Sequence, residues 1–194
     1  YRVERYAIEP LARDAVVDGN INNLEAVADS VKRAHKRLGT RTKHVAMAVP
    51  TGAVITKKII VPAALREDEL EVQVESEANQ YIPFALDEVN LDFQIVGPAP
   101  NNPEESEVRI AASRKEKVED RVAAAEAAGL KPRVMDIESY AMQQAFELIS
   151  PTLPASGRDQ NIALVDIGAH VTHFYVLRNN QFLFARDQAF GGNQ

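Results

Sequence analysis

Between residues 106 and 149, strand-like and helix-like segments alternate along the chain. "EVRIAAS" predicts a strand, residues 115–128 predict a helix closed by Gly129, "KPRVMDI" predicts a second strand, and residues 138–149 predict a second helix. After the loop "SPTLPASGRDQ", strand patterns resume at about residue 161. Strands that alternate with helices at this spacing favour an α/β fold whose sheet contains parallel strands covered by helices.

The preceding residues also contain strand and helix signals. Residues 1–8 alternate as a strand would, and a helix is expected from about 23 to 38, capped by Asn20 or Asn22 and closed by Gly39. "HVAMAV" predicts a buried strand that ends before the break at Pro50-Thr51-Gly52.

Beyond this break, "AVITKKIIV" and "EVNLDFQIV" predict two strands. Between them, "REDELEVQVESEANQYI" predicts a helix with an acidic first turn, whose inner face carries Leu70, Val74 and Ala78. "GPAPNNPEES", a polar and proline-rich stretch, is interpreted as the clearest linker in the chain.

Composition narrows the possible functions. The chain has 194 residues, enough for one large or two small domains, and it contains no cysteine, which excludes disulfides and thiolate chemistry. A net charge of −6 argues against broad attraction to nucleic acid or anionic lipid, so the basic stretch "VKRAHKRLGTRTK" is interpreted as a solvated helix face. No apolar run approaches the roughly 20 residues of a membrane span. "YRVERYAIEP" does not resemble a signal peptide and lacks an initiator Met, which suggests an internal fragment.

The stretch "LVDIGAHVTHFYVL" is the most informative motif. A strand delivers Asp166 to its end, Gly168 permits a close turn, and Thr172 supplies a hydroxyl nearby. Such a turn can direct successive N–H groups at a phosphate while the carboxylate holds a metal-bound water, although a plain β-hairpin fits the spacing equally well. Asn179-Asn180 predicts a second tight turn, and Gly191-Gly192 predicts another close backbone approach.

Other candidate residues are less specific. His170 and His173 are three apart on an expected strand and should point to opposite faces, which disfavours a shared metal ion. Glu138 opens a helix directly after a strand, at the sheet edge where α/β folds place ligands, and could either orient a water or stabilise the helix start. No P-loop or G-x-S-x-G motif is present, and the acidic stretch "EDELEVQVESE" fits a solvated helix face.

Taken together, these motifs resemble a known family. The order of "VRIAASRKEKVEDRVAAAEAAGLKPRVMDIESYAMQQAFEL" and "ALVDIGAHVTHFYVLRNNQFLFARDQAFGGNQ" is similar to the actin-like ATPase superfamily. Within it, "EANQYIPFALDEVNLDFQIVG" resembles the PilM family of type IV pilus assembly proteins, with FtsA as the nearest relative by architecture. The resemblance covers essentially the whole chain.

The resemblance implies an actin-like (ribonuclease H-like) first lobe with an inserted FtsA-like α/β subdomain and an incomplete second lobe. The first-lobe core would comprise residues 1–50 and 106–160, without its first strands, and the insertion residues 51–105. The second lobe would begin within residues 161–194, which contain the phosphate turn.

The resemblance also implies roles for individual residues. "DIGAHVT" matches the family's second phosphate motif: Asp166 would face Mg²⁺ through water, Gly168, Ala169 and His170 would approach the phosphates by backbone, and Thr172 would support the turn. Gly191 and Gly192 match a glycine pair near ribose and phosphates. Glu138 falls where relatives place a water-polarising side chain, its candidate catalytic role.

The implied cofactor is ATP or ADP with Mg²⁺, held weakly or not at all by residues 1–194 alone because the other nucleotide motifs would lie outside them. The implied partner is the N-terminal cytoplasmic tail of PilN, with other pilus proteins or a second copy as further partners, no nucleic acid, and membrane contact only through the partner.

The tail would occupy a groove between first lobe and insertion. Tyr81, Ile82, Pro83 and Phe84 are candidates for one wall, unless they only pack the insertion core. The location would be cytoplasmic, beneath the inner membrane. Two alternatives stay open: a nucleotide-free structural adaptor, and a kinase or ATPase that acts on a small substrate.

Overall fold

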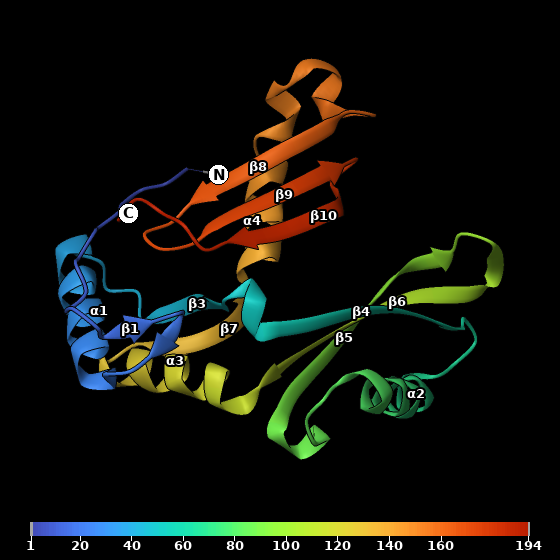
Figure 1. Cartoon of the computed structure of the whole chain (residues 1–194), viewed down its shortest axis with the longest axis horizontal. Coiled ribbons are helices and arrows are strands. Elements are labelled where there is room, and N and C mark those ends of the chain that lie inside the picture. Colours follow the sequence, from blue (N-terminus) through green and yellow to red (C-terminus); the bar gives the residue numbers. More distant parts are fainter. Residues whose placement is uncertain (1, 194) are drawn as a thin grey trace.

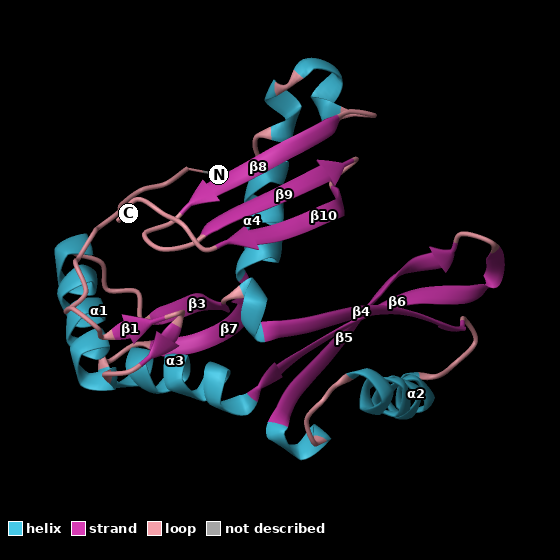
Figure 2. Cartoon of the chain, viewed as in Figure 1, coloured by secondary structure: helices cyan, strands magenta, loops and turns pink. Residues whose placement is uncertain are grey.

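The computed structural model describes residues 2–193, which form three small bodies built from helices and sheets (Figures 1 and 2). The mixed α/β class predicted from the sequence is confirmed. Beyond the elements described below, a short hairpin joins β1 (Val16–Val17) to β2 (Asn20–Ile21). The 3₁₀ turns are Thr51–Ala53, Leu86–Glu88, Ser150–Thr152 and Pro154–Gly157.

One body is an antiparallel sheet in the order β4 (Val54–Pro62), β6 (Asn102–Arg114), β5 (Val89–Ala99), covered on one face by α2 (Glu67–Tyr81) (Figure 1). Because strand side chains alternate between faces, Val108, Ile110 and Ala112 of β6 all turn toward the helix. There they meet Leu70 and Val74, two of the residues predicted for the helix's inner face. This body therefore has a hydrophobic core of its own.

A second body pairs β3 (His44–Val49) in parallel with β7 (Lys131–Ile137) and packs α1 (Leu24–Leu38) and α3 (Lys115–Ala127) against them. The helix α1 is capped by Asn23, whose side chain accepts a hydrogen bond from the Ala26 amide; the predicted caps Asn20 and Asn22 were wrong by one to three residues. Gly39 ends this helix in the left-handed conformation with φ 60°, as predicted.

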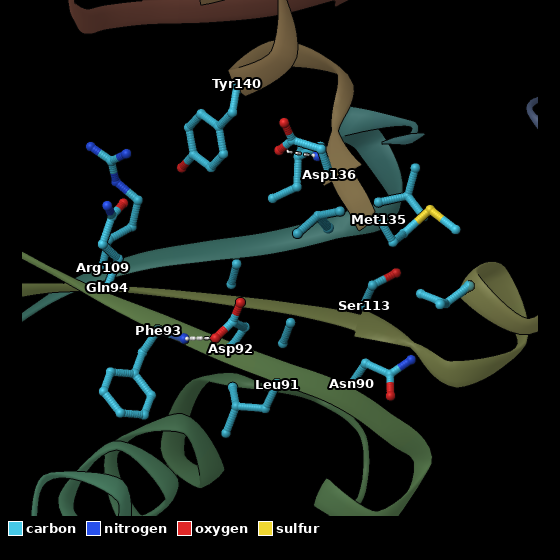
Figure 3. Close-up of a pocket in the computed structure, with 16 residues that line it drawn as sticks. Asn90, Leu91, Asp92, Phe93, Gln94, Arg109, Ser113, Met135, Asp136 and Tyr140 are labelled. Atoms are coloured by element: carbon cyan, nitrogen blue, oxygen red, sulfur yellow. Dashed lines mark hydrogen bonds between the residues drawn. The ribbon is translucent and has the colours of Figure 1, made fainter. Parts of the chain in front are cut away.

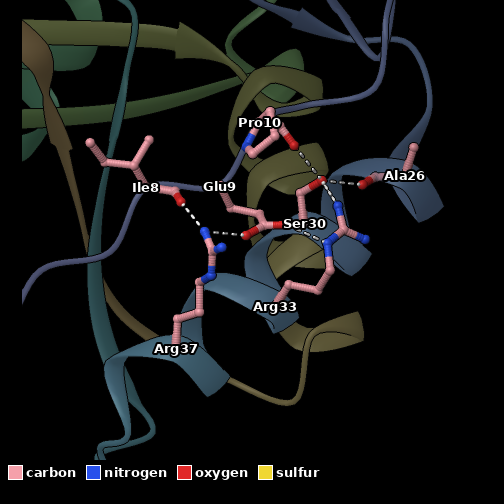
Figure 4. A network of polar contacts seen from close by, with 7 residues as sticks. All are labelled: Ile8, Glu9, Pro10, Ala26, Ser30, Arg33 and Arg37. Carbon is pink, nitrogen blue, oxygen red and sulfur yellow. Dashed lines mark hydrogen bonds and ion pairs between the residues drawn. The ribbon is translucent and has the colours of Figure 1, made fainter.

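Residues 2–10 run beside α1 without strand pairing, so the strand predicted for residues 1–8 is wrong where the structure describes it. Side chains hold this segment instead: Glu9 pairs with Arg33 (2.6 Å) and Arg37 (3.1 Å), and Arg37 donates to the Ile8 carbonyl (Figure 4). Alternation alone predicted a strand, but a strand also needs a neighbouring backbone to pair with.

The third body is the antiparallel meander β8 (Asn161–Ile167), β9 (Thr172–Arg178) and β10 (Gln181–Gln188), with α4 (Glu138–Glu147) against one face (Figure 1). The turn between β9 and β10 is the predicted Asn179-Asn180, with φ 49° and 57°. Both values lie in the left-handed region that a type I′ hairpin turn requires.

Two sequence interpretations need correction. The strands of the alternating segment do not share one sheet, because β6 pairs with β4 and β5, β7 with β3, and β8 with β9. The supposed linker "GPAPNNPEES" is the paired end of the β5–β6 hairpin, in which Gly97 faces Glu107 and Pro98 faces Ser106. Register shifts on either side of Pro98 accommodate residues that a regular ladder would reject.

Across residues 2–193, none of the helices has both the length and the apolar character needed to cross a bilayer.

Candidate functional site

A cavity of about 650 Å³ lies between the β4–β6–β5 sheet and the carboxyl end of β7 (Figure 3). Its floor is the sheet face opposite α2, where Asn90 faces Ser113, Asp92 faces Ala111, and Gln94 faces Arg109 across the β5–β6 ladder. Apolar side chains form the other walls: Val49, Val118, Met135 and Ile137. Its volume and its mixture of apolar walls with a few polar groups are typical of a ligand-binding site.

Arg109 and Tyr140 mark the boundary of this cavity. The Arg109 guanidinium lies over the Tyr140 ring, 4.9 Å from its centroid, in a cation–π contact (Figure 3). The same two residues also line two smaller neighbouring cavities, one beside β10 and one beside α4. The three cavities therefore meet at this pair.

The predicted phosphate turn connects β8 to β9 and packs against the glycine pair. A Cβ on Gly191 would lie 2.5 Å from the Gly168 carbonyl oxygen, so only glycine fits at this approach. The amides of Gly192 and Asn193 donate to the carbonyls of Gly168 and Ala169 at 2.9 and 3.0 Å. The Thr172 hydroxyl donates to the Phe190 carbonyl at 2.9 Å, which joins the two loops a second time.

Within this turn, the backbone donors are used unequally. The Gly168 amide donates to the Val171 carbonyl at 3.0 Å. This hydrogen bond closes the turn, so the Gly168 amide is not available to a ligand. Ala169 and His170 are exposed, and among the described residues no backbone acceptor faces their amides. These two N–H groups are therefore the ones free to bind an anion.

Tyr175 of β9 is buried, and the pKa of its hydroxyl responds to carboxylates on other elements. The side chain of Tyr175 is 1% exposed, and burial raises the pKa of its phenol above the ordinary value. The carboxylates of Asp187, Glu138 and Asp166 raise this pKa further, whereas a hydrogen bond to the Thr51 hydroxyl (3.4 Å) lowers it. Glu138 and Asp166, two of the predicted site residues, thus both act electrostatically on Tyr175, although among the described residues neither contacts its hydroxyl.

Glu138 is exposed and is the first residue of α4, while the N-cap position belongs to Ile137, which provides no side-chain cap. Its carboxylate can interact favourably with the positive end of the helix dipole, but it does not occupy the capping position. The Thr51 hydroxyl accepts a hydrogen bond from the next amide, that of Ser139, at 3.1 Å. Thr51 therefore connects the start of α4 to Tyr175.

Aromatic contacts extend from Tyr175 to the cavity. The Tyr175 ring meets Phe182 of β10 at 5.7 Å, and Phe182 meets Tyr140 of α4 at 5.8 Å. Because Tyr140 lies beneath Arg109, an unbroken row of rings joins the meander that carries the phosphate turn to the cavity. Sequence patterns did not predict this row, since its three rings come from three separate elements, β9, β10 and α4.

Tyr81, Ile82, Pro83 and Phe84, predicted as one wall of a partner groove, are not among the residues that line this cavity. Ile82 is buried in the core beneath α2. Tyr81 and Phe84 are exposed and lie under cations, with Lys57 Nζ 4.3 Å from the first ring and the Arg114 guanidinium 5.3 Å from the second. Their role in partner binding stays a prediction.

The two histidines lie differently from the sequence expectation. His170 belongs to the turn and not to the strand, whereas His173 lies in β9 and contacts Asp187 through Nδ1 at 2.7 Å.

The sequence interpretation missed Asp187 because it is one carboxylate in a strand of mixed composition. Gly52, noted only as a break in the pattern, lies beside it: a Cβ on Gly52 would be 3.6 Å from Asp187 Oδ2.

These features define a mixed α/β protein with a large cavity between the β4–β6–β5 sheet and β7, and with a separate glycine-rich turn between β8 and β9. A family model described as type IV pilus assembly protein PilM matches residues 1–194. The chain therefore belongs to the PilM family of type IV pilus assembly proteins, as the sequence resemblance implied.

Two solved structures are similar to this chain. A structure titled "PilM-PilN type IV pilus biogenesis complex" is similar with a TM-score of 0.78 and 31% identity, over 95% of this chain and 54% of that chain. The cytoplasmic domain of EpsL, an inner-membrane component of the type II secretion system of Vibrio cholerae, is similar in fold, with a TM-score of 0.52 and 12% identity over 84% of this chain and 56% of that one. The chain thus spans about half the length of each.

Proposed function

We propose that this protein is a cytoplasmic scaffold of the type IV pilus assembly machinery that holds the N-terminal tail of a PilN-type membrane protein in the cavity between β5, β6 and β7. Membership of the PilM family and the 31% identity to a chain solved in a PilM–PilN complex support the partner. The cavity of about 650 Å³ is the observation that carries the proposal.

The cavity suits an extended peptide. Its apolar walls can receive apolar side chains, while Asn90, Gln94 and Ser113 on its floor can hydrogen-bond to a peptide backbone. Ala111 lies between these polar groups and leaves room above the sheet because its side chain is small. The exposed rings of Tyr81 and Phe84 would extend the contact beyond the cavity.

Ala111→Trp tests the cavity directly, because an indole on its floor would occupy the space that the tail needs. We expect the affinity for a fluorescent synthetic PilN tail, measured by polarisation, to fall at least about tenfold, which corresponds to roughly 1.4 kcal/mol. Val72→Trp is the matched control, since Val72 is 68% exposed on α2, which covers the opposite face of the sheet. Equal affinity of the two variants would contradict binding in the cavity, and Tyr81→Ala with Phe84→Ala would then test the other wall.

We further propose the family organisation implied by the sequence: first-lobe core in residues 1–50 and 106–160, insertion in 51–105, and second lobe from 161. The boundary after 105 is moved to the end of β6, because this strand pairs with β4 and β5 as far as Ser113 and Arg114. Within it, the turn would contribute to an actin-like nucleotide site for ATP or ADP with Mg²⁺. The free amides of Ala169 and His170 would face phosphate oxygens, Asp166 would hold metal-bound water, Gly191 and Gly192 would lie near the ribose, and Glu138 would orient a water. The close fit of Gly191 against Gly168, which fixes the shape of the turn, supports this role.

Asp166→Ala tests the nucleotide proposal, and the test uses a protein that is as long as the structural relatives. We expect binding of labelled ATP with Mg²⁺ to weaken by about tenfold or more, because a carboxylate that orders metal-bound water would be lost. Asp68→Ala removes an exposed carboxylate of α2 and should leave binding unchanged. Unaltered binding in Asp166→Ala would favour the nucleotide-free adaptor, whereas ATP turnover that depends on a small acceptor would favour a kinase.

A further inference from the structure

Two carboxylates from different elements line the proposed peptide cavity. Asp92 projects from β5 on the cavity floor, and Asp136 lies near the end of β7 in the facing wall (Figure 3). They come from separate bodies of the fold, so no local sequence pattern predicts that they share a site. Their position across one cavity is a property of the tertiary structure.

Both carboxylates are held in place from one side. Asp92 Oδ1 accepts a hydrogen bond from the Phe93 amide at 2.9 Å, and Asp136 Oδ1 accepts one from the Ile137 amide at 2.7 Å. In each case the second oxygen keeps its capacity to accept. Throughout residues 2–193, no ion pair includes either carboxylate.

The cavity is also lined by one cationic side chain, Arg109, which contacts an aromatic ring and not the two carboxylates. The Arg109 guanidinium lies over the Tyr140 ring at 4.9 Å and forms no ion pair within the described part of the chain. Two carboxylates against one guanidinium leave the lining with a net charge of −1. The apolar walls around them exclude part of the water that would otherwise screen this charge.

We infer that the cavity selects a peptide with a cationic group, a Lys or Arg side chain or a free α-amine, which Asp92 and Asp136 hold between them. This inference rests on the proposed function and adds the chemistry of the occupant. A divalent metal is a poorer candidate, because residues 2–193 contain no group of three or more side chains suited to a metal ion. An ammonium or guanidinium can instead donate several hydrogen bonds to two separate carboxylates.

The contribution of each carboxylate to the affinity for the tail depends on how far water reaches the cavity. Hydrogen bonds between charged groups contribute more than neutral ones, but a cavity open to water screens part of the interaction. We therefore expect about a tenfold change in affinity when one carboxylate is neutralised, decreasing as salt is added. A cation bound in this way also favours rapid association with an oppositely charged peptide.

The test compares two synthetic PilN tails, the natural one and a version with an acetylated N-terminus and every Lys and Arg replaced by Gln. For the natural tail we expect Asp92→Asn and Asp136→Asn each to weaken binding about tenfold, whereas the neutral tail should bind all proteins with the same, lower affinity. Asp87→Asn is the control, because Asp87 is exposed before β5 and does not line the cavity. Asp92→Lys should bind a tail with Glu in place of the cation better than the natural tail.

The outcomes separate this inference from the proposed function. If both tails bind the unaltered protein equally and Ala111→Trp weakens both, the cavity holds the tail and the cationic preference is wrong. If neither tail binds, both ideas are wrong. A loss that is confined to the cationic tail and is restored by the reversed charge pair supports the inference.

Discussion

Replacing Ile110 by alanine should lower the free energy of unfolding by about 2–5 kcal/mol. Ile110 lies on β6 with 3% exposure, at the centre of the core that α2 closes. Truncation removes buried apolar area and leaves a cavity in a closely packed region, and both effects destabilise the folded state. Urea denaturation followed by circular dichroism measures the change.

Ile60→Ala provides the matched control for Ile110→Ala. Ile60 belongs to β4 of the same sheet, but it is 49% exposed. Because much of its side chain already contacts water, the same truncation should cost well under half as much. Comparable losses for the two variants would show that the core of this body is not packed as described.

Gly191→Ala should destabilise the protein by about 1–3 kcal/mol, although it adds only a methyl group. The new Cβ would lie 2.5 Å from the Ala169 carbonyl carbon and from the Gly168 carbonyl oxygen. These are backbone atoms and cannot rotate away, so the loop around Gly191 must separate from the phosphate turn. The hydrogen bonds that Gly192 and Asn193 donate to the turn would then weaken.

Gly192→Ala tests whether the effect depends on this contact. A Cβ at Gly192 would lie 3.9 Å from the Gly168 carbonyl oxygen, an ordinary van der Waals distance. We expect thermal unfolding of Gly192→Ala to resemble that of the unaltered protein and Gly191→Ala to unfold at a lower temperature. A reversed order would mean that the two loops do not meet as described.

Local features of the fold could be predicted from the sequence because local physics determines them. Leu70, Val74 and Ala78 recur at four-residue spacing and form the buried face of α2. Gly39 ends α1, and Asn179-Asn180 forms the hairpin turn, because few residues adopt a positive φ easily. Each of these signals requires only a few neighbouring residues.

Strand pairing could not be predicted, because a strand pattern does not specify its partner. The segment containing Val108 and Ile110 reads as one strand of an alternating series, yet it pairs with β4 and β5. For the same reason, the alternation in "EVNLDFQIV" predicted a strand but not what its polar face would lie against. That face forms the floor of the cavity, because β7 lies opposite it.

The two faces of β6 restrict which amino-acid substitutions the family can accept along this strand. Its even-numbered residues Val108, Ile110 and Ala112 build the core, while Arg109, Ala111 and Ser113 between them line the cavity floor. Selection for stability and selection for partner preference therefore act on interleaved sets of positions. Under the proposed function, substitutions at Arg109 and Ala111 would alter recognition with little cost to folding, whereas inserting one residue would exchange the two sets and damage both.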